Sequence, residues 1–412
     1  MFLNGLYIFS FKYMDSDLSR LPDWSPPGSA LRILPGLNQL VNTTSIPKSG
    51  SIQKSSDSGI EGNPEGVTKP FEYKSHPKRR TPTLTEYIEG VKKGNRALLA
   101  QAITLIESKN NLHQQLAQKL LTALLPDSGR SIRIGITGVP GAGKSSLIES
   151  IGTTLCQKGH KVAVLAVDPT STLTHGSILG DKTRMENLSR EPNAFIRPSP
   201  SGGTLGGVAA RSRETMLLCE AAGYDVILVE TVGVGQSEVT VRTLVDLFML
   251  VLIPGGGDEL QGIKKGVVEL ADLVVINKAD GDNEFKASLA RSEYEKALHY
   301  QNPITEGWVP RALACSAYTG SGLPELWQTV LDFFKVTQES GVLAKRRHSQ
   351  KISWMKNLCE DGLVRLFYTH PEVQAELPKL ENLVSEGKVL PADGMNILIE
   401  LFLGKISPKA TE

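Results

Sequence analysis

The sequence predicts an α/β fold in which a mostly parallel sheet is flanked by helical extensions at both ends. Between residues 132 and 315, short apolar runs alternate with helix-period segments, a pattern typical of βαβ units. Before and after this region the apolar residues follow only a helical period. The expected strands are Ile132–Ile136, Val162–Val167, Val226–Val229, Leu247–Ile253, Leu273–Ile276 and Ala312–Cys315.

Composition and charge exclude several classes of protein. Among 412 residues, 45 Lys and Arg oppose 44 Asp and Glu, so the net charge of +1 creates no field that attracts nucleic acid or an anionic membrane. The 4 Cys lie far apart without a C-x-x-C pair, which excludes a disulfide scaffold and a zinc ribbon. No apolar run approaches the ~18 residues of a membrane span. We therefore expect a soluble intracellular protein that binds neither nucleic acid nor membrane.

The chain divides into four predicted segments. Residues 1–82 are rich in Pro, Gly and Ser and lack lasting periodicity, so we expect a disordered extension. Order is expected to begin at Thr83, because Thr83 and Glu86 have the spacing of a helix capping box. Residues 83–127 then form an N-terminal helical segment, residues 128–337 the α/β domain, and residues 338–412 a C-terminal helical region.

A glycine-rich loop is the strongest functional motif. It follows the strand expected over residues 132–136 and precedes a helix expected over Ser146–Cys156, in the pattern G-x-x-x-x-G-K-S. The amides of such a loop surround phosphates, while Lys144 would reach the β- and γ-phosphates and Ser145 would ligate Mg²⁺. The alternative is a glycine turn with a solvated lysine, but the strand–loop–helix context favours a P-loop NTPase. The predicted phosphate-binding residues are Gly138, Val139, Pro140, Gly141, Ala142, Gly143, Lys144, Ser145 and Ser146.

An acidic residue ends a second apolar strand. The run over residues 225–229 leads directly into Glu230. P-loop enzymes hold Mg²⁺ with an acid in this position, whereas an isolated acid after a strand more commonly caps a helix. The presence of the glycine-rich loop favours the metal-site interpretation for Glu230.

Two further loops predict which base is bound. Residues 277–280 follow the strand expected over Leu273–Ile276 and have the pattern N-K-x-D. A carboxylate there accepts hydrogen bonds from N1–H and the 2-amino group of guanine, which adenine does not offer, so the motif selects GTP over ATP. Residues 316–318 follow the next strand, where a second guanine-contacting loop is expected. The predicted base-binding residues are Asn277, Lys278, Asp280, Ser316, Ala317 and Tyr318.

Together these motifs resemble the MeaB/ArgK/MMAA family, which belongs to the metallochaperone-type group of P-loop GTPases. The resemblance runs from about Thr83 to Leu403. Glu230 stands where most small GTPases carry the Asp of D-x-x-G, and this replacement marks the group. The longer runs that look like the narrower family are residues 166–169, 180–185, 230–237 and 257–265.

The resemblance implies a magnesium site and mobile switch segments. It places Asp181 in the first switch, and it makes residues 257–265 an additional switch in which Lys264 moves on hydrolysis. Without the resemblance, the charges of that segment would be read as a solvated helix start. The implied metal ligands are Ser145, Asp168, Asp181 and Glu230, and the implied catalytic residues are Lys144, Asp181 and Glu230.

The family consists of GTPase chaperones of methylmalonyl-CoA mutase, so the resemblance implies an Mg²⁺-dependent GTPase that gates cofactor loading and protects an adenosylcobalamin-dependent acyl-CoA mutase. It also implies a homodimer built through the C-terminal helices. Two alternatives stay open: a kinase that transfers the γ-phosphate to a protein or amino acid, and a non-catalytic nucleotide-sensing scaffold. Nickel insertion is disfavoured because the 7 His are scattered. We expect the bacterial cytoplasm as the compartment, or the mitochondrial matrix if the source is a eukaryote.

The residue that follows the second phosphate-site motif predicts slow intrinsic hydrolysis. Val234 occupies the position where Ras-type GTPases carry the Gln that orients the attacking water. Gln236 lies two residues further on, and Arg184 is either a charge supplied to the site or a surface arginine. A valine side chain neither donates nor accepts a hydrogen bond, so we expect the partner to accelerate turnover.

Overall fold

The computed structural model describes residues 81–108, 110–167, 185–198, 205–231, 237–255 and 265–404. All of them lie in one compact unit, Lys78–Glu412. Residues 1–80 lie outside the described residues, and with them nearly all of the segment predicted to be disordered.

Three helices form the N-terminal part of this unit: α1 (Leu84–Lys92), α2 (Arg96–Glu107) and α3 (Asn111–Leu124). The predicted capping box is present, because Thr83 Oγ1 accepts from the Glu86 amide at 3.3 Å and Glu86 Oε2 accepts from the Thr83 amide at 2.7 Å. The buried faces of α1–α3 share one hydrophobic core with the sheet. The 3₁₀ turn η1 (Leu125–Asp127) then leads into the first strand.

The sheet has seven strands in the order β3-β2-β4-β1-β5-β6-β7, and every neighbouring pair is parallel. The predicted α/β fold is therefore confirmed. The edge strand β3 was not predicted, because its apolar run has only three residues, Ala194–Ile196, before Arg197 interrupts it. The strands are β1 (Ile132–Gly138), β2 (Val162–Val167), β3 (Ala194–Arg197), β4 (Val226–Thr231), β5 (Leu247–Leu252), β6 (Leu273–Ile276) and β7 (Arg311–Ala314).

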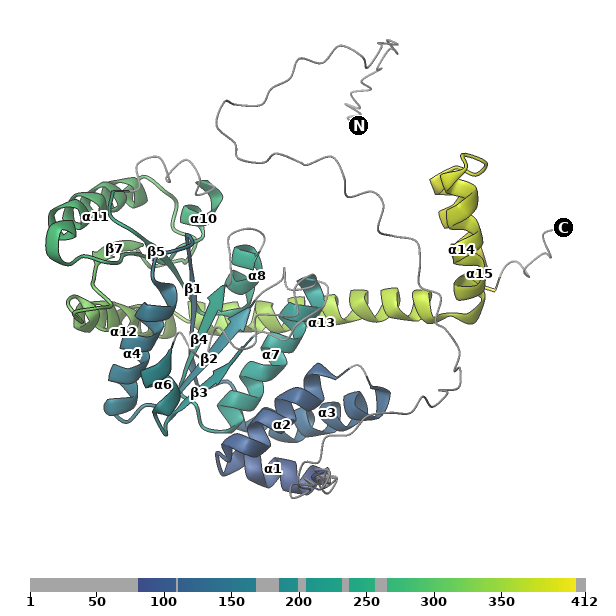
Figure 1. The fold of residues 1–412 in the computed structure, drawn as a ribbon, viewed down its shortest axis with the longest axis horizontal. Helices are drawn as coiled ribbons and strands as arrows, with labels where there is room; N and C mark the ends of the chain where they lie inside the picture. Colours follow the sequence, from purple (N-terminus) through teal and green to yellow (C-terminus); the bar gives the residue numbers. More distant parts are fainter. Residues whose placement is uncertain are drawn as a thin grey trace, which may run out of the picture. The chain divides into compact units, whose positions relative to one another are not determined.

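Helices cover both faces of the sheet (Figure 1). Along β5, Met249 and Val251 face one core, whereas Phe248 faces the other, which is the alternation expected of a strand buried on both sides. The first core is covered by α4 (Lys144–Gln157), α6 (Glu186–Arg190) and α12 (Leu323–Glu339). The opposite face is covered by α1–α3, α7 (Leu205–Ala221), α8 (Ser237–Leu244), α10 (Lys265–Glu269) and α11 (Glu284–His299).

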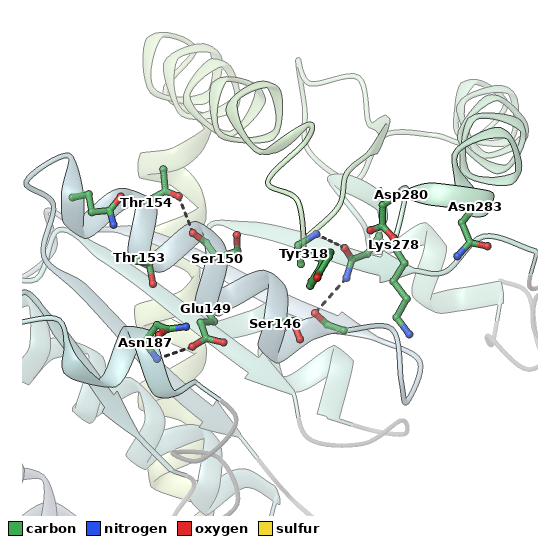
Figure 2. Close-up of a pocket in the computed structure, with 14 residues that line it drawn as sticks. Ser146, Glu149, Ser150, Thr153, Thr154, Asn187, Lys278, Asp280, Asn283 and Tyr318 are labelled. Atoms are coloured by element: carbon green, nitrogen blue, oxygen red, sulfur yellow. Dashed lines mark hydrogen bonds between the residues drawn. The ribbon is translucent and has the colours of Figure 1, made fainter.

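Because all strands are parallel, their carboxyl ends meet at one edge of the sheet, where α/β proteins bind ligands. In the register, Gly138 at the end of β1 pairs with Val251, and Ile136 pairs with Glu230. A cavity opens beside α4 at this edge (Figure 2). The fold therefore gathers the motif-bearing loops in one place.

Three helices follow the α/β region: α13 (Val342–Thr369), α14 (Pro371–Ser385) and α15 (Pro391–Phe402). They share a small core in which the rings of Phe367 and Phe402 lie 5.4 Å apart. In the described ranges, none of the helices combines the length and apolar character that crossing a bilayer requires.

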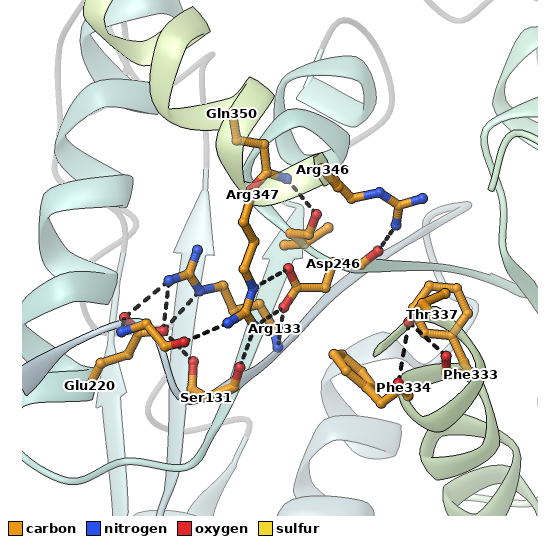
Figure 3. A network of polar contacts seen from close by, with 12 residues as sticks. Ser131, Arg133, Glu220, Asp246, Phe333, Phe334, Thr337, Arg346, Arg347 and Gln350 are labelled. Atoms are coloured by element: carbon orange, nitrogen blue, oxygen red, sulfur yellow. Dashed lines mark hydrogen bonds and ion pairs between the residues drawn. The ribbon is translucent and has the colours of Figure 1, made fainter. Parts of the chain in front are cut away.

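A buried charge network attaches α13 to the amino-terminal edge of the sheet (Figure 3). Asp246, which directly precedes β5, is fully buried and accepts from Arg347 Nε at 3.0 Å and from a terminal nitrogen of the same guanidinium at 2.6 Å. Arg347 also donates to the carbonyls of Gly129 and Ser131, each at 2.6 Å. Gln350 adds a bond of 2.8 Å to the carbonyl of Val245. The first turns of α13 are thereby fixed to β1 and β5.

We predict that Asp246→Ala lowers the free energy of unfolding by about 3–5 kcal/mol, because it leaves a partly buried guanidinium without its counter-charge. Chemical denaturation monitored by circular dichroism measures this loss. As a control, Glu186→Ala removes the exposed Glu186–Arg190 pair and should change stability by less than about 1 kcal/mol. Equal effects of the two substitutions would contradict a structural role for the network.

Candidate nucleotide-binding site

The predicted phosphate loop joins β1 to α4. Gly138 ends β1, residues 139–143 form the loop, and Lys144, Ser145 and Ser146 make the first turn of α4. Gly138 has φ of 151°, and a Cβ there would overlap the carbonyl oxygen of Val251. Gly143 has φ of 82°, and its Cβ would lie 2.6 Å from Asn277 Nδ2. Glycine is therefore required at both ends of the loop, by backbone conformation and by close packing.

Lys144 extends along the inside of this loop. Its ammonium donates to the carbonyls of Gly138 at 2.9 Å and Val139 at 3.3 Å. The backbone N–H groups of the first turn of α4 and the positive end of its helix dipole both face this loop. The loop thus presents both a cation and backbone donors, which are the groups that hold a phosphate.

Ser145 and Glu230 supply two adjacent oxygen atoms. Glu230 lies in β4, is 7% exposed, and accepts a hydrogen bond of 2.9 Å from the Ser145 hydroxyl at Oε1. Hard oxygen atoms of this kind suit Mg²⁺, which proteins hold through one or two carboxylates in company with substrate phosphates. The structure brings these two predicted ligands together, whereas Asp168 and Asp181 lie outside the described residues. Among the described residues, no group of three or more acids, His or Cys forms a metal cluster.

The buried side chain of Asn277 joins the phosphate loop to the two predicted base-binding loops. Its Nδ2 donates to the carbonyl of Ala142 at 2.8 Å, and its Oδ1 accepts from the Ala317 amide at 3.1 Å. The backbone amide of Asn277 donates to the carbonyl of Leu252 at 2.8 Å, which extends the pairing of β6 with β5 by one residue. One amide side chain therefore fixes the relative positions of three loops.

Asp280 is oriented by the second loop. Ser316, which is fully buried, donates from its hydroxyl to Asp280 Oδ2 and accepts from the Thr319 amide at 3.0 Å. Lys278 has φ of 59°, the only positive value for a non-glycine residue in the part of the chain that the structure describes. Such strain is characteristic of functional loops.

Tyr318 and Cys315 differ sharply in exposure although they are three residues apart. Tyr318 is 93% exposed and lines the cavity. Burial raises the pKa of the Cys315 thiol to about 12, so this cysteine stays a neutral packing residue beside Asn277. We therefore assign no nucleophilic role to Cys315.

These loops and one face of α4 enclose a cavity of about 720 Å³ (Figure 2). Asn277, Lys278, Asp280, Ala317 and Tyr318 line one side of it. On the other side of the cavity, Ser146 was predicted to bind the nucleotide, whereas the remaining residues were not predicted, although the polar residues of α4 recur at helical spacing and so carry a readable signal. The residues that were not predicted are Glu149, Ser150, Thr153, Thr154 and Gln157 of α4, together with Asn187 of α6.

Several predicted residues lie outside the described part of the chain. They are Asp168, Asp181, Arg184, Val234, Gln236 and residues 257–264 of the predicted additional switch. Their predicted roles stay predictions.

Comparisons with known proteins agree with these motifs. A family model described as "Methylmalonyl Co-A mutase-associated GTPase MeaB" matches residues 99–372. A putative GTPase from Caulobacter vibrioides is 55% identical over 309 residues, which span 75% of this chain and 94% of that protein. The mouse "Methylmalonic aciduria type A homolog, mitochondrial" is 46% identical over 323 residues, spanning 76% of this chain and 78% of its own length.

A solved structure agrees as well. The crystal structure of an LAO/AO transport system kinase is 41% identical, covers 78% of this chain and 98% of its own chain, and superposes with a TM-score of 0.61. At this identity and coverage the likeness extends beyond the α/β core.

We predict that Asn277→Ala lowers the free energy of unfolding by about 2–3 kcal/mol, because it leaves the Ala142 carbonyl and the Ala317 amide without their partner. Urea denaturation gives the change, and hydrogen exchange should be faster at the Ala317 amide. Asn283→Ala removes another amide that lines the same cavity and serves as the matched control. A control variant as destabilised as Asn277→Ala would show that Asn277 does not join the loops.

Proposed function

Because the chain belongs to the MeaB family of methylmalonyl-CoA mutase-associated GTPases, we propose that it is an Mg²⁺-dependent GTPase that serves as a chaperone of an adenosylcobalamin-dependent methylmalonyl-CoA mutase. As a member of that family it converts GTP and water to GDP and phosphate. In the proposal, nucleotide state gates the loading of the mutase with its cofactor and protects the mutase from inactivation. The arrangement that supports nucleotide binding most directly is the Asn277 side chain, which joins the phosphate loop to the base-binding loops.

Each end of the nucleotide has a matching group in this proposal. The phosphates lie against the loop of residues 138–143 and the first turn of α4, where Lys144 and the backbone amides offset their charge. Guanine lies against Asp280, whose carboxylate is held by Ser316, and beside Ala317. Tyr318 and Lys278 line the same side of the cavity as the base.

Ser145 and Glu230 would hold Mg²⁺, and the proposal adds Asp168 and Asp181 as further ligands. When bound, Mg²⁺ would supply positive charge that offsets the negative charge developing on the phosphates. The protein's own contribution is to hold the serine hydroxyl and the glutamate carboxylate at 2.9 Å within a nearly buried site. We also propose Lys144, Asp181 and Glu230 as the residues that act on the reacting phosphate.

The C-terminal helices are proposed to form a homodimer. α13 leaves large apolar side chains exposed beyond its anchored turns, and exposed patches of this kind mark association sites. The exposed apolar residues of α13 are Ile352, Met355, Leu358, Leu363, Val364, Leu366 and Tyr368. Our proposed compartment is the bacterial cytoplasm, or the mitochondrial matrix in a eukaryote, because the mouse relative is named as mitochondrial.

We predict that Asp280→Asn weakens GDP binding by about ten- to a hundredfold without unfolding the protein. The variant loses a charge-assisted acceptor for guanine, and hydrogen bonds to charged groups contribute about 1.5–3 kcal/mol each. Calorimetric titrations with GDP and ADP measure both affinity and base preference. The control is Asp282→Asn, which removes an exposed carboxylate two residues away. Unchanged base preference in Asp280→Asn would disprove our assignment of the base pocket.

We predict that the isolated protein hydrolyses GTP far more slowly than about 1 s⁻¹, and that the mutase accelerates it by about tenfold or more. Single-turnover assays with γ-labelled GTP test this, with Lys144→Ala as the inactive reference. A rate near ~1 s⁻¹ that the mutase does not change would refute partner control. Wild-type turnover equal to that of Lys144→Ala would favour the non-catalytic scaffold, and label on any acceptor other than water would favour the kinase.

We predict that Leu363→Glu combined with Leu366→Glu converts a homodimer into a monomer that still binds GDP. Both side chains are more than half exposed on α13, so the monomer tolerates carboxylates at these positions. In the proposed dimer the same carboxylates would be buried without counter-charges, which makes the free energy of association less favourable. Light scattering at micromolar concentration measures the mass. Val309→Glu places the same charge on a similarly exposed residue of the α/β region and should stay dimeric. A monomeric wild type would rule out the dimer.

A further inference from the structure

One face of α4 carries a polar stripe that the phosphate loop does not use. Ser146, Glu149, Ser150 and Thr153 follow one another at intervals of three and one residues and all line the cavity. The opposite face of α4, which includes Leu147 and Ile151, is buried in the core. A polar face kept in contact with the cavity over several turns is suited to bind a polar part of the ligand.

Glu149 lies one turn beyond the phosphate loop on the side of α4 that lines the cavity. Ser146 lies in the first turn of α4, beside the phosphate loop, and Asp280 lies on the base-binding side of the same cavity. Glu149 is three residues beyond Ser146, a rise of about 4.5 Å along the helix. A ribose connects the innermost phosphate to the base and has similar dimensions. A ribose between phosphates at the loop and a base at Asp280 would therefore come within reach of this turn of α4.

The carboxylate of Glu149 is held in place by its neighbour. Its Oε1 atom accepts a hydrogen bond of 2.8 Å from the backbone amide of Asn187, at the start of α6 (Figure 2). Within the described residues, Oε2 makes no hydrogen bond, and the half-buried side chain lines the cavity. One oxygen atom is thus fixed to the protein, while the other is an acceptor available to a ligand.

We infer that Glu149 binds the free 2′- and 3′-hydroxyls of the guanine nucleotide and thereby makes the site specific for unmodified ribonucleotides. This inference rests on the proposed function, because it requires a guanine nucleotide in the cavity. An acidic side chain recognises ribose hydroxyls in this way in dinucleotide-binding folds. Its negative charge also repels a phosphate group attached to either hydroxyl.

The first test compares GDP with 2′-deoxy-GDP by calorimetry. The wild type should bind GDP about tenfold more tightly, the effect of losing one hydrogen bond to a charged group. In Glu149→Ala the ratio should fall to about one, while the preference for GDP over ADP stays unchanged. Gln157→Ala, at the far end of the same stripe, is the matched control and should keep the wild-type ratio.

The second test uses guanosine 3′-diphosphate 5′-diphosphate as the probe. The wild type should bind it more weakly than GDP, and Glu149→Gln should narrow that difference because the charge is gone. Glutamine retains an acceptor for the Asn187 amide, so this variant preserves the contact between α4 and α6.

Two kinds of failure are distinguishable. A wild type that prefers GDP over ADP but binds GDP and 2′-deoxy-GDP equally overturns the inference alone. The same holds if Glu149→Ala keeps the tenfold ratio. A wild type that binds no guanine nucleotide overturns the proposed function, and this inference with it.

Discussion

The two hydrogen bonds of the Asn277 side chain are the contact on which the candidate site depends. They connect segments that are about 40 to 135 residues apart in the sequence, at a position only 1% exposed. A buried amide that lost either partner would leave polar groups without water or protein to satisfy them, so the three loops are stable only in this arrangement. The phosphate loop and the base-binding loops therefore form a single rigid unit, and glycine at position 143 is needed to let the amide approach.

Charges gather at the two edges of the sheet because its interior is apolar. At the amino-terminal edge, Asp246 and Asp272 are fully buried. Asp246 accepts a hydrogen bond of 3.3 Å from the backbone amide of Arg133 in β1, and Asp272 accepts one of 2.9 Å from the backbone amide of Phe248 in β5. These acids need arginine partners, which Arg347 and Arg242 supply. The carboxyl edge is left for the ligand. The network thus keeps the strands in register from the edge opposite the candidate site.

Local patterns made much of the fold and site predictable. Glycine positions, the acid at the end of β4 and the N-K-x-D loop are fixed by backbone geometry within a few residues, so spacing alone identifies them. Contacts between distant segments were not predictable. Nothing near Arg347 in the sequence indicates Asp246, about 100 residues away, and nothing near Glu149 indicates Asn187. The edge strand β3 was missed for another reason, since only three apolar residues, Ala194–Ile196, precede Arg197 and such a run is too short to predict a strand.

The attachment of α13 to the sheet also constrains the length of that helix. Arg346, Arg347 and Gln350 fix the rotation of its first turns, and the exposed apolar residues around Leu363 lie more than three turns further along the same continuous helix. Inserting a single residue between them would turn the apolar face by about 100° and shift it by about 1.5 Å. Inserting seven residues would nearly restore its direction, with a remaining rotation of about 20°. Length variation in this stretch of α13 is therefore tolerable only in near-heptad steps if the direction of the apolar face matters.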